Sequence, residues 1–360
     1  MINKVRGLNM RSLNMRSFGV AAVCAAGLTL AVPAGSAPIE SATYDLAAKA
    51  YANEDFAVAR DLAYRAAKDG DADAQTMYAF MLATGKGGEV DETAAAGWYG
   101  MATRQGNKDA YYGLAMMAQE ELGGVERQHM LGYLREAALA GHGEAARQLA
   151  EYYYYGQEGL PKDPEKMLYW LMTAAYHLDP QSAYAAGVFF AEGIEAGIQA
   201  NPEMAGRYLK HAAELGVVDA MVDYGLFLYQ GRYGEPNRGQ AALWFEKAAK
   251  AGDVGAMFMI AYVLSKAEGV EQDLELAYKW LVKADSTGSE VDQASRDKLM
   301  AALEKFIPPP RRAELTGEIY GASGVPVKGS KSDASPAGPP AGLEKEAPEA
   351  RPLAPTPQEG

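Results

Sequence analysis

The sequence predicts an all-α protein: a right-handed α-solenoid of about seven helix-turn-helix repeats, followed by a disordered C-terminal tail. Three observations predict this fold class. A one-residue corner recurs every 35 to 38 residues, a small residue recurs nine positions after it, and all four tryptophans fall in one column of the repeat. A period in the mid-thirties with two helical segments per unit is typical of an α-solenoid.

Each corner is a glycine, or in one repeat a leucine, and the residue after it begins the next helix. Glycine adopts the left-handed conformation at a helix end at the lowest cost. Asp and Asn side chains accept hydrogen bonds from the first N–H groups of a helix. The corner residues are Gly70, Gly106, Gly141, Leu178, Gly216, Gly252 and Gly288. The residues that follow the first six are Asp71, Asn107, His142, Asp179, Val217 and Asp253, so four of the six are good N-caps.

A large aromatic residue lies four positions before a pair of small residues, such as Ala248-Ala249, near the end of each second helix. We expect these rings to pack between neighbouring repeats, where each buries on the order of 150–250 Å². We interpret them as repeat-packing residues and not as ligand-binding residues. The column reads Trp98, Tyr133, Trp170, Tyr208, Trp244 and Trp280.

Single repeats combine several of these recurring residues. Tyr224-Gly225 and Gly231 precede Ala241–Gly252, and Leu149–Gly156 precedes Trp170–Ala175 in the same way. This pattern resembles the Sel-one-like repeat (SLR) family, a relative of the tetratricopeptide repeat, over roughly residues 60 to 290.

The resemblance implies a solenoid that acts by binding, and in bacteria a periplasmic adaptor in sensor-kinase control, exopolysaccharide regulation or cell-envelope assembly. Two repeats depart from the family pattern. Leu178 replaces a corner glycine, and Glu121 stands where the repeat at 110–141 should have a loop glycine. We expect these two repeats to bend the stack differently from the others.

Residues 1–37 are predicted to be a cleaved signal peptide, which implies a periplasmic or secreted protein. The alternative is an uncleaved N-terminal membrane anchor, although the apolar stretch is short for a span, which needs about 20 apolar residues. Cleavage removes the only cysteine, Cys24, and changes the formal net charge from −13 to −17. So acidic a chain is not expected to bind nucleic acid. The elements of the signal are the basic residues Lys4, Arg6, Arg11 and Arg16, the apolar segment Phe18–Val32 and the cleavage zone Pro33–Ala37.

The repeats are expected to be closed at both ends. Residues 38–70 are predicted to form an N-terminal capping hairpin, 71–290 the repeats, and 291–307 a C-terminal capping helix. Residues 308–360 hold eleven of the eighteen prolines and are predicted to be a disordered Pro/Ala-rich tail. This tail is interpreted as a flexible linker or, alternatively, as a carrier of a short docking motif.

Two sets of equivalent positions, four residues apart on the first helix of each repeat, lie on one face of that helix. They predict a protein-binding groove of aromatic and aliphatic side chains with a polar break, suited to a peptide or a partner's helix. The alternative is that the second column belongs to the core between helices. The candidate residues are Tyr112, Met116, Arg147, Glu151, Tyr155, Tyr184, Phe258 and Tyr262.

No catalytic, cofactor-binding or metal-binding residues are predicted. The four histidines lack metal-ligand spacing, and no nucleophile–base pair is evident. We therefore expect an exported, non-enzymatic adaptor or scaffold of the bacterial cell envelope. Its partner would be a protein, such as an envelope sensor or assembly protein, with no nucleic acid and no stable membrane insertion. One alternative is a scaffold that binds peptidoglycan or another glycan. A second is a hydrolase of the β-lactam-binding type, against which the lack of mature cysteines argues.

Overall fold

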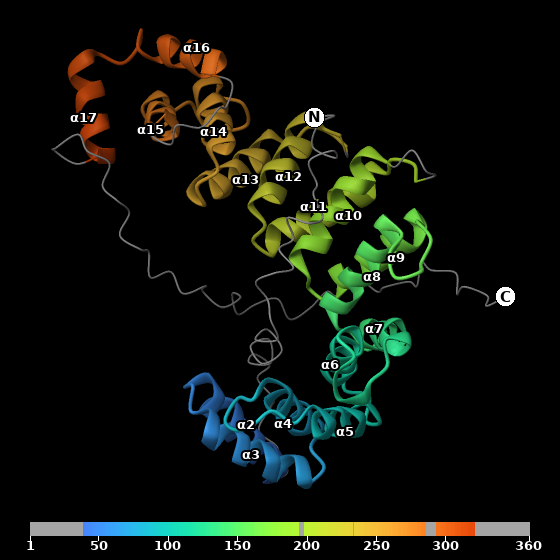
Figure 1. Cartoon of the computed structure of the whole chain (residues 1–360). Helices are drawn as coiled ribbons and strands as arrows, with labels where there is room; N and C mark the ends of the chain where they lie inside the picture. Colours follow the sequence, from blue (N-terminus) through green and yellow to red (C-terminus); the bar gives the residue numbers. More distant parts are fainter. Residues whose placement is uncertain (1–38, 194–197, 233, 286–292, 321–360) are drawn as a thin grey trace.

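The computed structural model describes residues 39–193, 198–232, 234–285 and 293–320. Sixteen α-helices and two short 3-10 helices make up the regular structure of these residues, and successive helices pack against each other along a curved stack (Figure 1). The predicted all-α solenoid is confirmed. The predicted signal peptide, the corner at Gly288 and the tail from residue 321 lie outside the described residues.

Each repeat contributes a first and a second helix. The first helices are α2 (Ile39–Ala52), α4 (Ala72–Thr84), α6 (Lys108–Gln119), α8 (Gly143–Tyr155), α10 (Pro180–Glu192), α12 (Val218–Gln230) and α14 (Val254–Lys266). The second helices are α3 (Phe56–Lys68), α5 (Glu92–Thr103), α7 (Met130–Leu139), α9 (Pro164–Tyr176), α11 (Pro202–Glu214), α13 (Arg238–Lys250) and α15 (Leu274–Asp285). Two 3-10 helices, η3 (Leu122–Gly124) and η4 (Arg127–His129), separate α6 from α7, and α16 (Gln293–Leu303) and α17 (Pro309–Tyr320) follow α15.

The corners have the geometry that the sequence predicts. All six described corner residues have a positive φ, between 64° at Leu178 and 102° at Gly252. Five of the six following residues cap the next helix with a side-chain atom, as Asp253 does by accepting a 2.6 Å hydrogen bond from the Ala256 amide. Val217 has no such hydrogen bond. The corners therefore fix the direction of each new hairpin through the backbone and the cap.

Leu178 adopts the left-handed conformation without being glycine. A residue with a Cβ loses roughly 1–2 kcal/mol in this region because the Cβ crowds the carbonyl oxygen that follows. Its side chain is 64% exposed, so burial does not offset that cost. The predicted departure at this corner is therefore one of local strain, and the corner keeps its shape.

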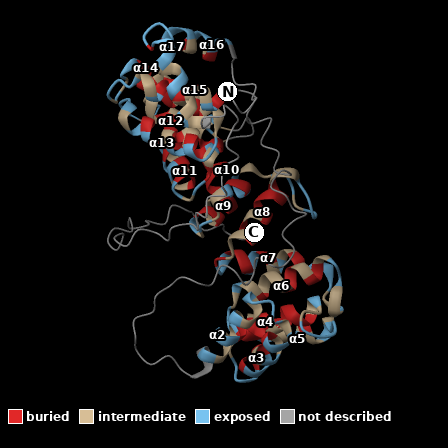
Figure 2. Ribbon diagram, turned by 90° about the vertical axis from the view of Figure 1, so that its left-hand side faces the viewer, coloured by how far each residue is buried: buried red, intermediate tan, exposed pale blue. Residues whose placement is uncertain are grey.

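Figure 2 shows buried residues along the helices of the stack, and each second helix from α5 to α15 contributes one large buried side chain. The large residues lie one position after the predicted aromatic column, and all are at most 4% exposed. They are Tyr99, Leu134, Leu171, Leu209, Phe245 and Leu281. A Cβ on Gly225 would lie 2.6 Å from the Phe245 ring, and one on Gly187 would lie 2.9 Å from the Leu209 side chain.

The aromatic column makes contacts both within hairpins and between them. Trp170 and Trp244 are buried, while the other four members of the column are half-buried. Several of their ring contacts lie within one hairpin, as when Trp244 meets Tyr224 edge-on at 5.7 Å. Trp98 does reach the preceding repeat, where it meets Tyr64 at 6.2 Å. The column covers the rim of each hairpin, and the next residue fills its centre.

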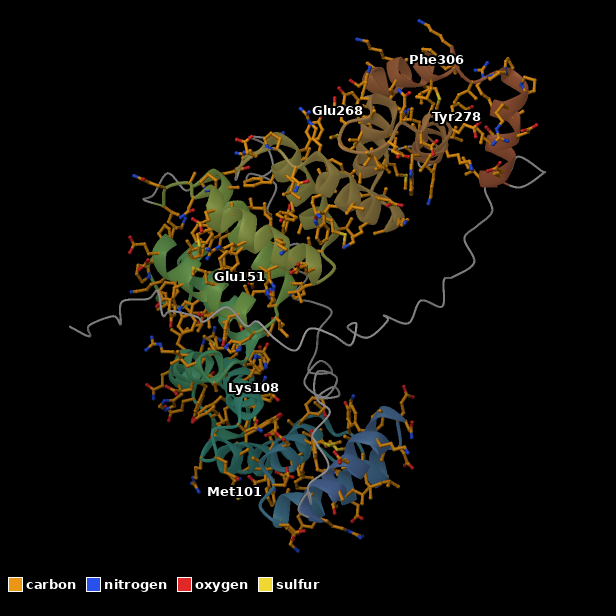
Figure 3. All side chains as sticks on the ribbon, turned by 180° about the vertical axis from the view of Figure 1, so that it is seen from behind. Met101, Lys108, Glu151, Glu268, Tyr278 and Phe306 are labelled. Carbon is orange, nitrogen blue, oxygen red and sulfur yellow. The ribbon has the colours of Figure 1, made fainter. Side chains whose placement is uncertain are left out.

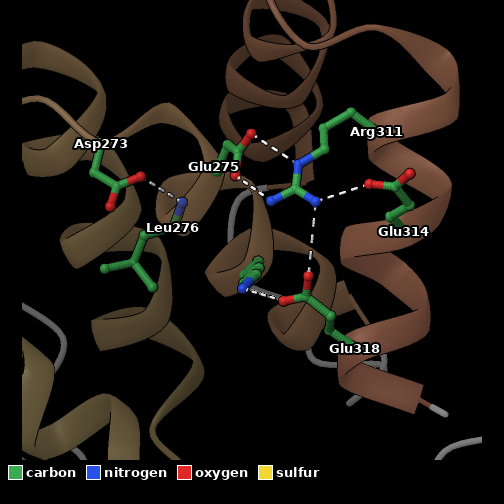
Figure 4. A network of polar contacts seen from close by, with 7 residues as sticks. Asp273, Glu275, Leu276, Arg311, Glu314 and Glu318 are labelled. Atoms are coloured by element: carbon green, nitrogen blue, oxygen red, sulfur yellow. Dashed lines mark hydrogen bonds and ion pairs between the residues drawn. The ribbon is translucent and has the colours of Figure 1, made fainter.

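The C-terminal boundary of the helical part is corrected. Residues 309–320, predicted to belong to the tail, form α17, which lies beside α15 (Figure 4). Prolines are tolerated in the first turn of a helix because those N–H groups have no intrahelical partner, so Pro309 and Pro310 start this helix. Leu315 is fully buried. Arg311 donates to both carboxylate oxygens of Glu275 on α15, at 2.9 and 2.7 Å.

We predict that Gly225→Ala destabilises the protein by about 1–3 kcal/mol, because the new methyl group overlaps the buried Phe245 ring. The matched control is Gly97→Ala. Gly97 lies within α5 with open space around its Cβ position, and this change should stabilise the helix by up to about 1 kcal/mol. Urea unfolding followed by circular dichroism measures both, and equal effects of the two substitutions would contradict the close fit of Phe245 against Gly225.

Candidate functional site

The eight predicted groove residues all lie on first helices, namely α6, α8, α10 and α14. Glu151 on α8 and Tyr184 on α10 are buried, with 8% and 9% of their surface exposed, and the other six are half-buried. None is fully exposed. The two columns therefore form a partly covered surface, part open face and part core between helices.

The first helices lie on the inner side of the stack. Between α2 and α15, the equivalent helices of neighbouring repeats that come closest are first helices, namely α2 with α4 and α4 with α6. Side chains continue this contact farther along, where the Tyr184 hydroxyl donates to Asp223 across α10 and α12 at 2.9 Å. We call the face that the first helices α4 to α12 present to this side the inner surface.

Tyr112 lies on α6, and its ring reaches the corner between α7 and α8. Its ring stacks on the His142 imidazole with 4.2 Å between ring centroids. His142 Nδ1 accepts the capping hydrogen bond from the Ala145 amide at 3.1 Å, and Nε2 lies 3.6 Å from the Asp109 carboxylate. Burial and then the nearby charge of Lys108 lower the pKa of His142 to about 4. The side chain of His142 is only 12% exposed.

Arg147 forms the polar break that the sequence predicts. Its guanidinium pairs with Glu144 in the same helix and lies 3.9 Å from Asp179 at the next corner. Burial opposes the charge of Arg147, but the hydrogen bonds that it donates to Glu144 and the carboxylates around it raise its pKa overall. The cation is thus held by acids of two successive repeats. Figure 3 shows Glu151, which also raises this pKa, on α8, and Lys108 at the start of α6.

Tyr184 lies among carboxylates. Burial raises its pKa first, followed by the charge of Asp223 and the hydrogen bond to it, and then by Asp219 and Glu192. These three acids are not among the predicted groove residues. Asp219 and Asp223 lie outside the two columns from which the groove was predicted, although the position of Asp219 is also acidic at Asp73, Asp109 and Glu144. Asp219 and Glu192 are exposed.

The remaining candidates do not join this region. Phe258 and Tyr262 lie on α14, 6.5 Å apart between ring centroids, and pack on the core of the last repeats. Tyr155 is half-buried at the end of α8, where it meets Tyr154 edge-on at 4.9 Å. The structure brings Tyr112, Arg147 and Glu151 into neighbouring repeats and leaves the α14 pair several helices away.

The described residues show no group of three or more His, Cys, Asp or Glu side chains placed to hold a metal ion. Among these residues, too, no helix is both long enough and apolar enough for a membrane span.

Five segments of the chain match the model of the Sel1 repeat: residues 72–107, 143–177, 180–217, 218–253 and 254–284. The chain belongs to the Sel1 repeat family. The segment from 108 to 142, which contains the two 3-10 helices, is not among the matched segments. The predicted departure at Glu121 thus coincides with an irregular connection between α6 and α7.

Similar proteins include regulators of a polysaccharide-synthesising enzyme. The chain is 26% identical over 289 residues to the chitin synthase regulator SKT5 of Saccharomyces cerevisiae, covering 66% of this chain and 41% of that protein. It is 23% identical over 219 residues to chitin synthase regulatory factor 2 of Schizosaccharomyces pombe, covering 57% and 43%. The chain therefore spans less than half the length of these relatives.

A solved structure supports the fold. The protective antigen c5321 of uropathogenic Escherichia coli, which displays an SLR fold, is similar with a TM-score of 0.50 and 23% identity. The similarity covers 79% of this chain and 62% of that one. At this identity the similarity concerns the fold alone.

We predict that acidification below about pH 6.5 destabilises the corner at His142. Because its folded pKa is about 4, below the ordinary value of 6.5, stability is complete above pH 6.5 and is lost as the pH falls towards 4. The loss should be at most about 3 kcal/mol, since each unit of pKa corresponds to 1.36 kcal/mol. The comparison variant is His142→Asn, which keeps a capping side chain as Asn107 does but does not titrate. Urea unfolding at pH 7, 5.5 and 4.5 should show a flatter profile for this variant, and an unchanged profile would exclude His142 as the cause.

Proposed function

We propose that the protein is a non-enzymatic adaptor that binds other proteins through the inner surface. The observation that carries the proposal is the row of aromatic, aliphatic and charged side chains, half-buried or buried, that the first helices α6, α8, α10 and α12 present in successive repeats. Its family also supports this role, since stacked repeats offer an extended surface for a partner. The names of the two fungal relatives, both regulators of an enzyme, favour binding over catalysis.

The partner class is the finer part of the proposal. We infer that the chain regulates or scaffolds an assembly that makes or organises extracellular polysaccharide, in line with the relatives named for chitin synthase. We further propose that it works after export, as a periplasmic or secreted protein, on the strength of the basic and apolar pattern of residues 1–37.

Export is tested by mass spectrometry of the N-terminus of the protein recovered from its host. A chain that begins at residue 35 or 37 is expected, because cleavage after Ala34 or Ser36 suits the small-residue zone. A chain that begins at Met1, Met10 or Met15 and remains in the soluble cell interior would contradict export. An intact N-terminus in the membrane fraction would support the anchor.

The adaptor role is tested by photo-crosslinking in the host cell. The photoreactive amino acid p-benzoylphenylalanine replaces Gln181 on the inner surface, or Arg207 on α11 as the control; both side chains are exposed. A protein adduct is expected at Gln181 and not at Arg207. Neither substitution removes a side chain of the Tyr112–His142 stack or of the Tyr184–Asp223 hydrogen bond, so the fold should persist.

The outcomes separate the candidate roles. A discrete protein adduct at Gln181 supports the adaptor. Adducts to peptidoglycan or another glycan alone would support the glycan-binding scaffold and overturn the adaptor. Equal protein adducts at both positions would place binding outside the inner surface, contrary to the proposal.

A further inference from the structure

Charged side chains are divided unequally between the two helices of the repeats. The first helices α4, α6, α8, α10 and α12 carry seven acidic and two basic residues. The second helices α5, α7, α9, α11 and α13 carry six acidic and seven basic residues. The first helices are thus acidic, while the second helices are close to neutral. The acids of the first helices are Asp73, Asp109, Glu144, Glu151, Glu192, Asp219 and Asp223.

The two cations of the first helices already have partners within the stack. Arg147 pairs with Glu144 and lies near Asp179. Lys108 donates to the Gly141 carbonyl oxygen at 3.5 Å. The cations therefore do little to neutralise the part of the inner surface beyond α8.

The helices α10 and α12 carry three of the seven acids. Neither helix contains a basic residue, and together they carry Glu192, Asp219 and Asp223. Asp223 accepts a hydrogen bond from the Tyr184 hydroxyl at 2.9 Å, and Asp219 lies one turn before Asp223 on α12. Glu192 and Asp219 are exposed to solvent.

Apolar side chains lie in the same place. Val222 and Leu226 of α12 are half-buried and only partly covered by the neighbouring core. Tyr184 lies at the equivalent position of α10 and keeps 9% of its surface exposed. The surface thus combines partly open apolar groups with exposed carboxylates, a pairing suited to a segment that alternates apolar and cationic side chains.

We propose that the α10–α12 part of the inner surface docks a segment of a partner protein that carries lysine or arginine next to apolar residues. The inference rests on the proposed adaptor function and adds the chemistry of the partner. Complementary charge speeds the encounter and excludes acidic competitors, while the apolar contacts hold the segment in place. Acidic peptides and phosphate groups are repelled by the same carboxylates.

The test uses the full chain and two fluorescein-labelled twelve-residue peptides, one alternating Lys and Leu and one alternating Glu and Leu. Fluorescence anisotropy measures binding at 50 and 300 mM NaCl. The inner variant is Glu192→Gln with Asp219→Asn. The matched control is Glu203→Gln with Glu214→Gln, which removes two exposed carboxylates from the second helix α11 and therefore changes the net charge equally.

The basic peptide should bind wild type, and bind the inner variant at least fivefold more weakly. The control variant should change the affinity by less than twofold, and salt should weaken binding to wild type more than to the inner variant. Circular dichroism melting of both variants checks that each remains folded.

Four results would overturn the proposal. The first is an equal loss of affinity for the basic peptide in both variants, the second is comparable binding of the acidic peptide, and the third is no binding of the basic peptide. The fourth is self-association of wild type that the inner variant abolishes, because a second copy of the chain would then be the occupant. A protein adduct at Gln181 together with any of these leaves the adaptor function standing and removes only the basic partner. Specific binding of the basic peptide without any protein adduct would remove the adaptor function instead.

Discussion

The fit of one large side chain against one small residue, seen where Leu209 meets Gly187 and Phe245 meets Gly225, is the constraint on which the rest of the structure depends. Phe245 against Gly225 shows it most clearly, since a single added methyl group would overlap the ring. Each hairpin has one apolar stripe that it cannot cover alone, so the interlock within a hairpin and the stacking of neighbours bury the core together. Dense packing leaves this centre little tolerance for a change of volume.

The corners turn that packing into a stack of defined direction. A left-handed residue ends each second helix, and a side-chain cap begins the next first helix. Because the cap position is partly free of packing demands, it varies: Asp and Asn are permanent caps, Val217 makes none, and His142 adds a group that titrates. The same position therefore sets geometry everywhere and sensitivity to pH at one corner.

The inner surface acquires its character from positions that packing does not fix. Side chains of the first helices that face the next repeat are held by cross-repeat contacts, such as Tyr184 with Asp223 and Tyr112 with His142. Positions one turn away are exposed and free to carry charge, as Asp219 and Glu192 do. A stack of nearly equivalent hairpins can in this way present a local, chemically distinct surface for a partner.

The sequence by itself determined the period, the helical hairpins, the corner glycines and the caps, because these follow from backbone conformation and local hydrogen bonds. It also identified the family and the first helices as carriers of the candidate site. Only the tertiary structure decided that the residue after each tryptophan fills the core, that α17 begins at Pro309, and that Tyr184 and Glu151 are largely covered. These outcomes depend on which neighbour faces a side chain across the stack, and spacing along the chain does not contain that information.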